Sequence, residues 1–188
     1  YTLGFSIEDC CNLANHAASI VCSKAGSATV TVNELVASIH QSGEFKQLDI
    51  ENLSTTLEYL REQGKRIVFT NGCFDLLHAG HLSSFNQAKA MGDVLIVGVN
   101  SDASIKRIKG ENRPIIDEDN RIAMLSALEC IDYVVKMEED NPVRLIEIIQ
   151  PDIAVKGEDW RNKVIPEKEI IESYGGEMKF IKLSDGLS

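Results

Sequence analysis

Hydrophobic and polar positions divide the chain into a short helical N-terminal part and a longer part in which strands and helices alternate. Continuous apolar runs predict strands at 66–70, 93–99, 133–135, 152–156 and 177–181. Between them, apolar residues at helical spacing predict helices near 79–91, 101–107, 118–128, 142–149 and 166–173. Strands that are apolar on both faces and alternate with helices form a parallel sheet covered on both sides. The pattern therefore predicts an α/β fold with a Rossmann-like, doubly wound, five-stranded parallel sheet.

The first 48 residues carry helical patterns that are too short to enclose a core. One helix is expected at 6–22 and a second at 32–40, ended by Gln-Ser-Gly43. A helical hairpin of this size cannot bury a core of its own. A further amphipathic helix at 50–62, followed by Gly64, leads directly into the first strand. We therefore place a boundary between an N-terminal piece at 1–48 and one domain at 49–188.

Composition and charge narrow the partners that we expect. Hydrophobic residues make up 44% of the chain, and no apolar run approaches the roughly 18 residues of a membrane span. A net charge of −10 opposes binding to a nucleic-acid backbone, which depends on Lys and Arg displacing counterions. We therefore expect no membrane or nucleic-acid partner.

The cysteines indicate a reducing compartment. There are five of them, with neither paired nor zinc-ligand spacing: Cys10, Cys11, Cys22, Cys73 and Cys130. A cytoplasmic location is expected, with Cys10, Cys11, Cys22 and Cys130 interpreted as core residues.

The segment after the first strand carries the residues suited to chemistry. From Thr70 to His81 it reads Thr-Asn-Gly-Cys-Phe-Asp-Leu-Leu-His-Ala-Gly-His, and it lies where a parallel strand ends and a helix begins. Free backbone N–H groups and the positive end of the helix dipole suit a phosphate at such a turn. His78, three positions before His81 on the first helical turn, would direct its imidazole toward the same point. Gly72 and Gly80 leave room for a polyphosphate.

An isolated pair of histidines is more often a metal pair or two surface residues, but this pair belongs to a longer pattern. Gly-x-Phe-Asp-x-x-His-x-Gly-His runs from Gly72 to His81. It resembles the signature of the His-x-Gly-His nucleotidyltransferase superfamily, and this resemblance implies the strand order 3-2-1-4-5. Further segments are similar to the adenylyltransferase domain of bacterial bifunctional ADP-heptose synthases, at 99–102, 107–110, 113–115, 128–135, 156–160 and 172–177. The similarity covers about residues 50–188.

The resemblance implies a reaction and its participants. AMP would pass from ATP to the sugar phosphate D-glycero-β-D-manno-heptose 1-phosphate, giving ADP-heptose and pyrophosphate for lipopolysaccharide core biosynthesis. Mg²⁺ would be the cofactor, held largely by the triphosphate and without a dedicated protein metal site. A homo-oligomer is also expected.

The N-terminal piece is similar to a different enzyme. Residues 1–48 resemble the last helices of a ribokinase-like sugar kinase, followed by a linker. The phosphotransfer machinery of such a kinase would lie in an upstream domain that is missing here, so we expect no kinase activity from this chain. A docking hairpin unrelated to any kinase is the alternative.

The superfamily resemblance assigns roles to the motif and to the loop after the fourth strand, and a concentration of positive charge after the second strand of this acidic chain supplies basic candidates. The predicted catalytic residues are His78 and His81, acting on the α- and β-phosphate oxygens, and Lys109, acting on the triphosphate or the leaving pyrophosphate. The predicted nucleotide-binding residues are Thr70, Asn71, Gly72, Cys73, Phe74, Asp75, Gly80, Asp102, Arg113, Arg121, Lys156, Gly157, Glu158, Asp159 and Trp160.

Several of these roles have a structural alternative. Arg113 and Arg121 suit a phosphate contact or a structural ion pair. Asp75 suits either the orientation of a Mg²⁺-bound water or substrate hydroxyl, or a helix cap. Trp160 suits stacking on the base or sugar, or simple packing.

Two other functions stay open from the sequence. One is a cytidylyl- or adenylyltransferase for another small phosphate, such as glycerol 3-phosphate, because the choice of base depends on backbone contacts. The other is a non-catalytic nucleotide-binding module. A dinucleotide oxidoreductase is disfavoured because no Gly-x-Gly-x-x-Gly follows the first strand.

Overall fold

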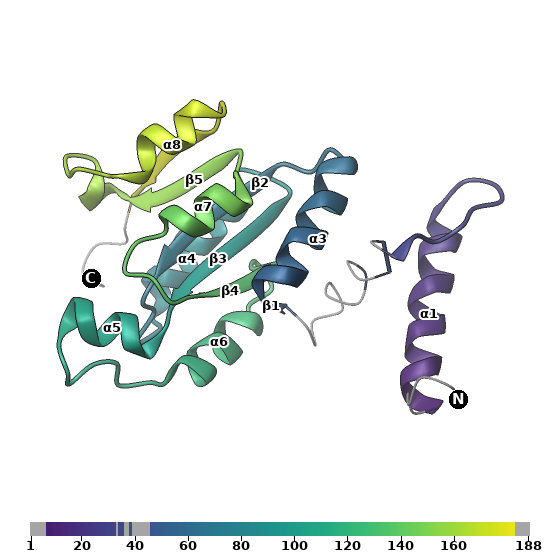
Figure 1. Cartoon of the computed structure of the whole chain (residues 1–188), viewed down its shortest axis with the longest axis horizontal. Coiled ribbons are helices and arrows are strands. Elements are labelled where there is room, and N and C mark those ends of the chain that lie inside the picture. The colour runs from purple at the N-terminus through teal and green to yellow at the C-terminus, as the bar shows by residue number, and fades with distance from the viewer. Residues whose placement is uncertain (1–6, 33, 36–37, 39–45, 183–188) are drawn as a thin grey trace.

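The N-terminal helix lies apart from a larger body built on one sheet (Figure 1). The computed structural model describes residues 7–32, 34–35, 38 and 46–182. Helix α1 (Ile7–Ser23) matches the first predicted helix, whereas much of the second one, at 32–40, lies outside the described residues.

The interpretation of the cysteines as core residues was mostly wrong. Cys10, Cys11 and Cys22 are exposed on α1. Cys130 is half-buried and packs against one of the two cores of the larger body.

Within the residues that the structure describes, six parallel strands form a single sheet in the order β1-β4-β3-β2-β5-β6. Their bounds are β1 (Gln47–Leu48), β2 (Ile67–Gly72), β3 (Val94–Asn100), β4 (Tyr133–Met137), β5 (Ile153–Gly157) and β6 (Glu177–Ile181). The five predicted strands take the implied order 3-2-1-4-5, so the Rossmann-like topology is confirmed. The expected count of five strands missed β1, which pairs with Val134 and Val135 of β4. A strand of two residues is too short to show the alternating pattern by which strands are predicted. Strand β1 places the start of the sheet just before residue 49.

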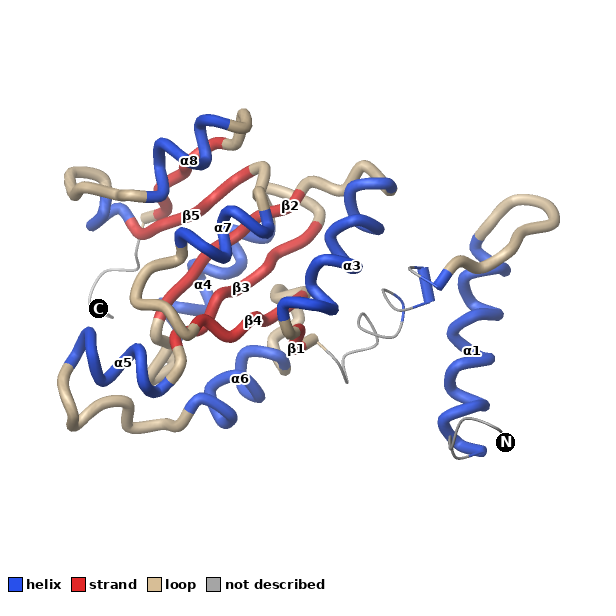
Figure 2. Tube along the Cα trace, viewed as in Figure 1, coloured by secondary structure: helices blue, strands red, loops and turns tan. Residues whose placement is uncertain are grey.

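Helices cover both faces of this sheet (Figure 2). The side chains of α3 (Ile50–Glu62), α7 (Val143–Ile149) and α8 (Glu167–Ser173) pack in one core, and those of α4 (Ala79–Lys89) and α6 (Glu118–Ser126) pack in the other. Helix α5 (Asp102–Lys109) follows β3, and the short 3₁₀ helix η1 (Glu158–Trp160) follows β5. The loops that carry the predicted site therefore emerge from neighbouring strands.

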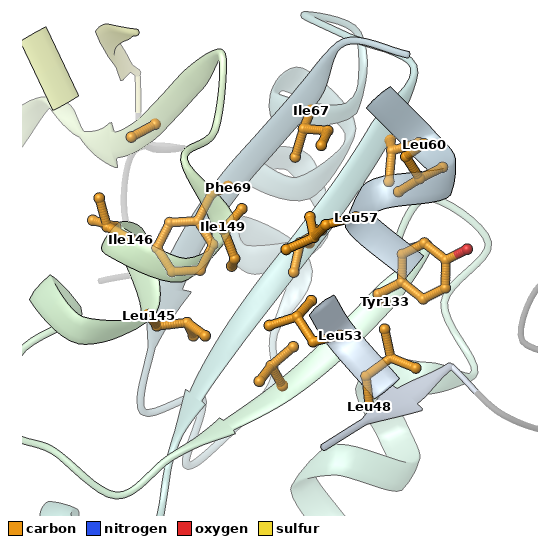
Figure 3. Packing of buried hydrophobic residues seen from close by; sticks show 14 of the residues in the cluster. Leu48, Leu53, Leu57, Leu60, Ile67, Phe69, Tyr133, Leu145, Ile146 and Ile149 are labelled. Atoms are coloured by element: carbon orange, nitrogen blue, oxygen red, sulfur yellow. The ribbon is translucent and has the colours of Figure 1, made fainter. Parts of the chain in front are cut away.

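The continuous apolar runs supply both cores because successive residues of a strand point to opposite faces. In β2, Ile67 and Phe69 enter the core that contains α3 and α7, and Val68 enters the other. Figure 3 shows the first core, in which the α3 leucines lie among side chains from α7 and the sheet: Leu53, Leu57, Leu60, Ile67, Phe69, Tyr133, Leu145, Ile146 and Ile149. Both faces of β2 are thereby fixed, which holds the strand that leads into the motif.

Replacing Leu57 by Ala should lower the free energy of unfolding by about 2–5 kcal/mol, the cost of deleting a large buried side chain. Leu57 is 1% exposed. The measurement is urea-induced unfolding followed by far-UV circular dichroism. Ile50→Ala is the matched control on the same helix, because Ile50 is 40% exposed, and it should cost no more than about 1 kcal/mol. Equal losses in the two variants would contradict this packing.

Candidate active site

A cavity of about 520 Å³ opens where β2 and β5 end. Strand β2 lies between β3 and β5, where the strand order reverses, and open α/β sheets bind ligands at that point. Most residues of the predicted site line this cavity: Thr70, Asn71, Gly72, Cys73, Phe74, Asp75, His78, His81, Lys109, Arg113, Gly157, Asp159 and Trp160. The fold thus gathers three loops that are far apart in the sequence around one hollow.

The turn between β2 and α4 depends on a close approach of Phe74 to Gly72. A Cβ atom at position 72 would lie 2.9 Å from Cζ of the Phe74 ring, so any larger residue would force this buried ring to shift. Phe74 has a φ of 47°, a left-handed conformation that a bulky residue rarely adopts. Its ring is buried against Phe85, with 5.2 Å between ring centroids, and this packing offsets the backbone strain.

His78 caps helix α4 with its own side chain. Its Nδ1 accepts a hydrogen bond of 3.1 Å from the backbone N–H of Gly80. Because a backbone N–H can only donate, Nδ1 is unprotonated, and the neutral ring carries its hydrogen on Nε2. The imidazole therefore has a donor available at the exposed edge of the motif. Since His78 is the cap, the suggestion that Asp75 caps this helix was wrong.

His81 stacks on His78, with ring centroids 3.9 Å apart and planes at 28°. Burial lowers the pKa of His81 to about 4, with further lowering by the nearby His78 and Lys109. Its Nδ1 is buried without a hydrogen-bond partner, and the rings of Phe74 and His81 pack in a T-shaped arrangement with centroids 5.4 Å apart. His81 is therefore neutral near pH 7, and an anionic ligand would favour its protonated form.

Asp75 ties the motif to the loop that follows α5. The carboxylate is 5% exposed, and its Oδ2 accepts a hydrogen bond of 2.6 Å from Arg113. Its Oδ1 accepts from the backbone N–H groups of Ile115 at 2.7 Å and Ile116 at 3.2 Å. Burial alone would raise the pKa of Asp75, but the hydrogen bonds from Arg113 and Ile115 lower it on balance. With both oxygens engaged, Asp75 holds Arg113 at the cavity, and the orientation of a Mg²⁺-bound water is not the role that this geometry favours.

Arg121 and Asp102 lie outside the cavity, so the structure corrects their assignment to the nucleotide. The side chain of Arg121 is fully buried, and its Nη1 donates to the carbonyl oxygens of Cys73 at 2.6 Å and Asn100 at 2.8 Å. Its Nε donates to the carbonyl of Ile116, and its Nη2 pairs with Asp102 at 2.7 Å. Of the two roles open from the sequence, the structural ion pair is the one observed.

Three further predicted residues lie outside the cavity lining. Gly80 is buried in the first turn of α4, where its N–H serves the cap. Glu158 pairs with Arg161 on the surface, and Lys156 pairs with Glu167 behind the cavity wall. These contacts, and not a nucleotide, occupy the charged groups of Glu158 and Lys156.

The sequence prediction missed four lining residues, namely Leu76, Ser84, Phe85 and Ile181. Ser84 and Phe85 lie three and four positions after His81 on α4, so their helical spacing could have revealed them. Ile181 comes from the end of β6, and no local pattern marks it as a site residue.

Cys73 lines the cavity, yet its surroundings do not activate it. Burial raises the pKa of its thiol, which disfavours the nucleophilic thiolate. Among the residues that the structure describes, no three or more His, Cys, Asp or Glu side chains are arranged to hold a metal ion. In that same part of the chain, no helix combines the length and apolar character needed to cross a bilayer.

Comparison with known families agrees with this geometry. The profile of the cytidylyltransferase-like family matches residues 69–182. The chain belongs to this family. Its assignment as a nucleotidyltransferase is thereby confirmed, and the matched residues include the motif, Lys109, Arg113 and the loop after β5.

Similar proteins include several that carry two activities in one chain. The chain is 46% identical to the bifunctional protein HldE of Geobacter metallireducens and 47% identical to that of Syntrophotalea carbinolica, over 98% of its own length. It is 46% identical to HldE of Helicobacter pylori over 97% of its length. It spans 38% of the length of each of these relatives. The resemblance to a bifunctional enzyme is confirmed for this portion.

Two solved structures share the fold. A lipopolysaccharide core biosynthesis protein from Thermoplasma volcanium is 31% identical, with a TM-score of 0.54, over 64% of this chain and 98% of that one. Pantoate-β-alanine ligase from Francisella tularensis is 16% identical, with a TM-score of 0.57, over 75% of this chain and 68% of its own. At that identity, the second likeness concerns the fold alone.

The ring of His81 should titrate with a pKa of about 4 in the free chain, because burial, followed by the nearby His78 and Lys109, disfavours its charged form. The measurement is the chemical shift of its ring C–H groups between pH 3 and 8, assigned with His81→Gln. Since the folded pKa lies below the unfolded one, the residue costs no stability above about pH 6.5 and destabilises the fold as the pH falls toward 4. Saturating triphosphate should raise this pKa. Titration above pH 6 without ligand would contradict the burial described here.

Proposed function

We propose that the chain transfers AMP from ATP to D-glycero-β-D-manno-heptose 1-phosphate, giving ADP-heptose and pyrophosphate for lipopolysaccharide core biosynthesis. The observation that carries the proposal is the stacked pair of His78 and His81, whose rings line a cavity that cationic and aromatic side chains also line. Lys109 and Arg113 follow β3, and Trp160 follows β5, so they reach the motif on β2 from its two neighbouring strands. This arrangement suits a base beside Trp160 and a polyphosphate beside the histidines and cations.

Catalysis would rest on positioning and on donors aimed at developing charge. An oxygen of the sugar phosphate attacks the α-phosphorus of ATP in line with the bond to the β-phosphate. The new P–O bond forms as that bond breaks, and pyrophosphate leaves with the electron pair. His78 donates a hydrogen bond from Nε2 to one phosphate oxygen, and His81 donates a hydrogen bond to an oxygen of the neighbouring phosphate. Lys109 neutralises the charge of the leaving pyrophosphate.

Mg²⁺ is the expected metal, and the lining fits an ion held mainly by the substrate. Mg²⁺ commonly uses one or two protein carboxylates together with phosphate oxygens and water. Asp159 lines the cavity with an exposed carboxylate, paired at 3.1 Å with Lys163, whereas both oxygens of Asp75 are engaged. Asp159 is therefore the side chain that would contribute to holding the ion. When bound, Mg²⁺ would supply positive charge to the triphosphate.

The relatives support the choice of acceptor. Similarity to the HldE proteins supports an adenylyltransferase role in ADP-heptose synthesis, and the Thermoplasma protein is named for lipopolysaccharide core biosynthesis. Within the same proposal, residues 1–48 are the remnant of a kinase domain followed by a linker, and the chain acts in the cytoplasm as a homo-oligomer.

The proposed reaction can be tested by pyrophosphate release with a matrix of substrates. ATP with heptose 1-phosphate should give the highest kcat/KM, with CTP at least about tenfold lower, on the scale that pocket contacts discriminate. Glycerol 3-phosphate should give no release above background. A preference for CTP or for glycerol 3-phosphate would favour another transferase of this class. ATP binding without pyrophosphate release from any pair would favour a non-catalytic nucleotide-binding module.

Replacing His81 by Ala should lower kcat by about 10²–10³, the scale for losing one donor that stabilises transition-state charge. The KM for ATP should change much less, because the donor acts mainly on charge that develops during the reaction. Steady-state kinetics with ATP and heptose 1-phosphate provide the measurement. Asn86→Ala, an exposed position on the same helix, is the control and should leave kcat unchanged. A loss below tenfold for His81→Ala would remove the histidine from the proposed mechanism.

A further inference from the structure

An ion pair lies behind the wall of the cavity. Nζ of Lys156, on β5, is 2.7 Å from Oε1 of Glu167, the first residue of α8. The two side chains are 12% and 3% exposed. Burying two charges removes them from water at a large cost in solvation free energy, so such a pair is weak evidence for stability alone. Its contacts with other side chains indicate what it holds in place.

The ammonium of Lys156 contacts two residues of the cavity wall. It lies 4.7 Å from the centroid of the Trp160 ring, and it donates a hydrogen bond of 3.4 Å to Oδ1 of Asn71. Trp160 and Asn71 both line the cavity. The buried pair thus connects α8 with the aromatic side chain after β5 and with the end of β2.

The ammonium of Lys163 also contacts the Trp160 ring, but it is more exposed to solvent than that of Lys156. Nζ of Lys163 lies 4.6 Å from the Trp160 ring centroid, but its side chain is 52% exposed and pairs with Asp159. An exposed cation gains less from an aromatic face than a desolvated one, because water competes for its charge. Lys156, held by Glu167, is therefore the cation that fixes the ring.

We propose that Glu167 is a positioning residue for the nucleotide. Through Lys156 it fixes the Trp160 indole at the cavity wall as the platform on which the adenine ring stacks. The indole lines the cavity and is 39% exposed, so part of its aromatic surface is accessible to a base. The inference rests on the proposed function, because it assigns the base end of the same cavity.

The test uses Trp160 itself, because it is the only tryptophan in the chain. ATP is titrated into the full chain while Trp160 emission is recorded, for the wild type, Glu167→Gln and Glu172→Gln. Glu172 is the matched control, since it lies on the same helix in an exposed pair with Lys168 at 3.7 Å. Glu167→Gln should raise the Kd for ATP by about tenfold, the scale of one well-placed aromatic contact, and should shift the emission of the free chain. Glu172→Gln should change neither.

Two further variants separate positioning from folding. Glu167→Gln leaves the Lys156 charge buried without its partner, so Lys156→Met combined with Glu167→Leu removes both charges and should restore the stability that the single variant loses. The ammonium is still absent, so the Kd for ATP should stay raised. In a Trp160→Leu background, measured by calorimetry, Glu167→Gln should add no further loss, because its effect passes through the ring.

The outcomes also separate this inference from the proposed reaction. ATP binding and Trp160 emission require no turnover, so a chain that binds ATP without adenylyl transfer would refute the reaction and leave the positioning role measurable. The inference is overturned if ATP leaves the emission of the wild type unchanged. It is also overturned if Glu167→Gln keeps the wild-type Kd, or if the double charge removal restores it. An equal further loss in the Trp160→Leu background would likewise refute it.

Discussion

The guanidinium of Arg121 is the contact on which the site depends. It is fully buried, and a buried charge is tolerated only when its donors are engaged. Its hydrogen bonds reach the carbonyls of Cys73 after β2 and Asn100 at the end of β3, the carbonyl of Ile116 and the carboxylate of Asp102. One side chain from α6 thus fixes the ends of two neighbouring strands and the loop between α5 and α6. Separating these segments would leave the buried charge without its hydrogen-bond partners, so Arg121 holds this side of the site together.

Asp75 extends the same constraint from the motif side. Its carboxylate accepts hydrogen bonds from Arg113 and from the backbone N–H groups of Ile115 and Ile116. Asp75 therefore joins the motif to the loop after α5, as Arg121 does from α6. From the sequence, the Asp75 carboxylate and the Arg121 guanidinium were both candidates for binding a ligand. In the structure their hydrogen bonds hold the segments around the cavity together. Lys109, Arg113 and the two histidines are left to face the cavity.

The stacked imidazoles have a consistent electrostatic setting. His78 accepts the Gly80 N–H at Nδ1, which leaves its Nε2 as a hydrogen-bond donor. His81 is kept neutral mainly by burial, which lowers its pKa. The two imidazoles can each donate a hydrogen bond, and they lie beside cationic side chains. A bound polyanion would stabilise positive charge that is unfavourable in the empty cavity, so this arrangement favours polyanion binding. This environment suits phosphoryl chemistry without an enzyme nucleophile, in agreement with the unactivated thiol of Cys73.

The sequence by itself determined the strand-and-helix alternation and the place of the motif at the end of β2. These features depend on local periodicity and on backbone sterics, which neighbouring residues specify. The strand order and the nucleotidyltransferase class followed from the resemblance that the motif revealed. Only the tertiary structure decided which polar residues face the cavity. Arg121 and Lys156 were assigned to the nucleotide, yet their partners are Asp102 and Glu167, on elements brought beside them by the sheet. The burial of a charged side chain and the partner that neutralises it depend on contacts distant in sequence, and no local pattern encodes them.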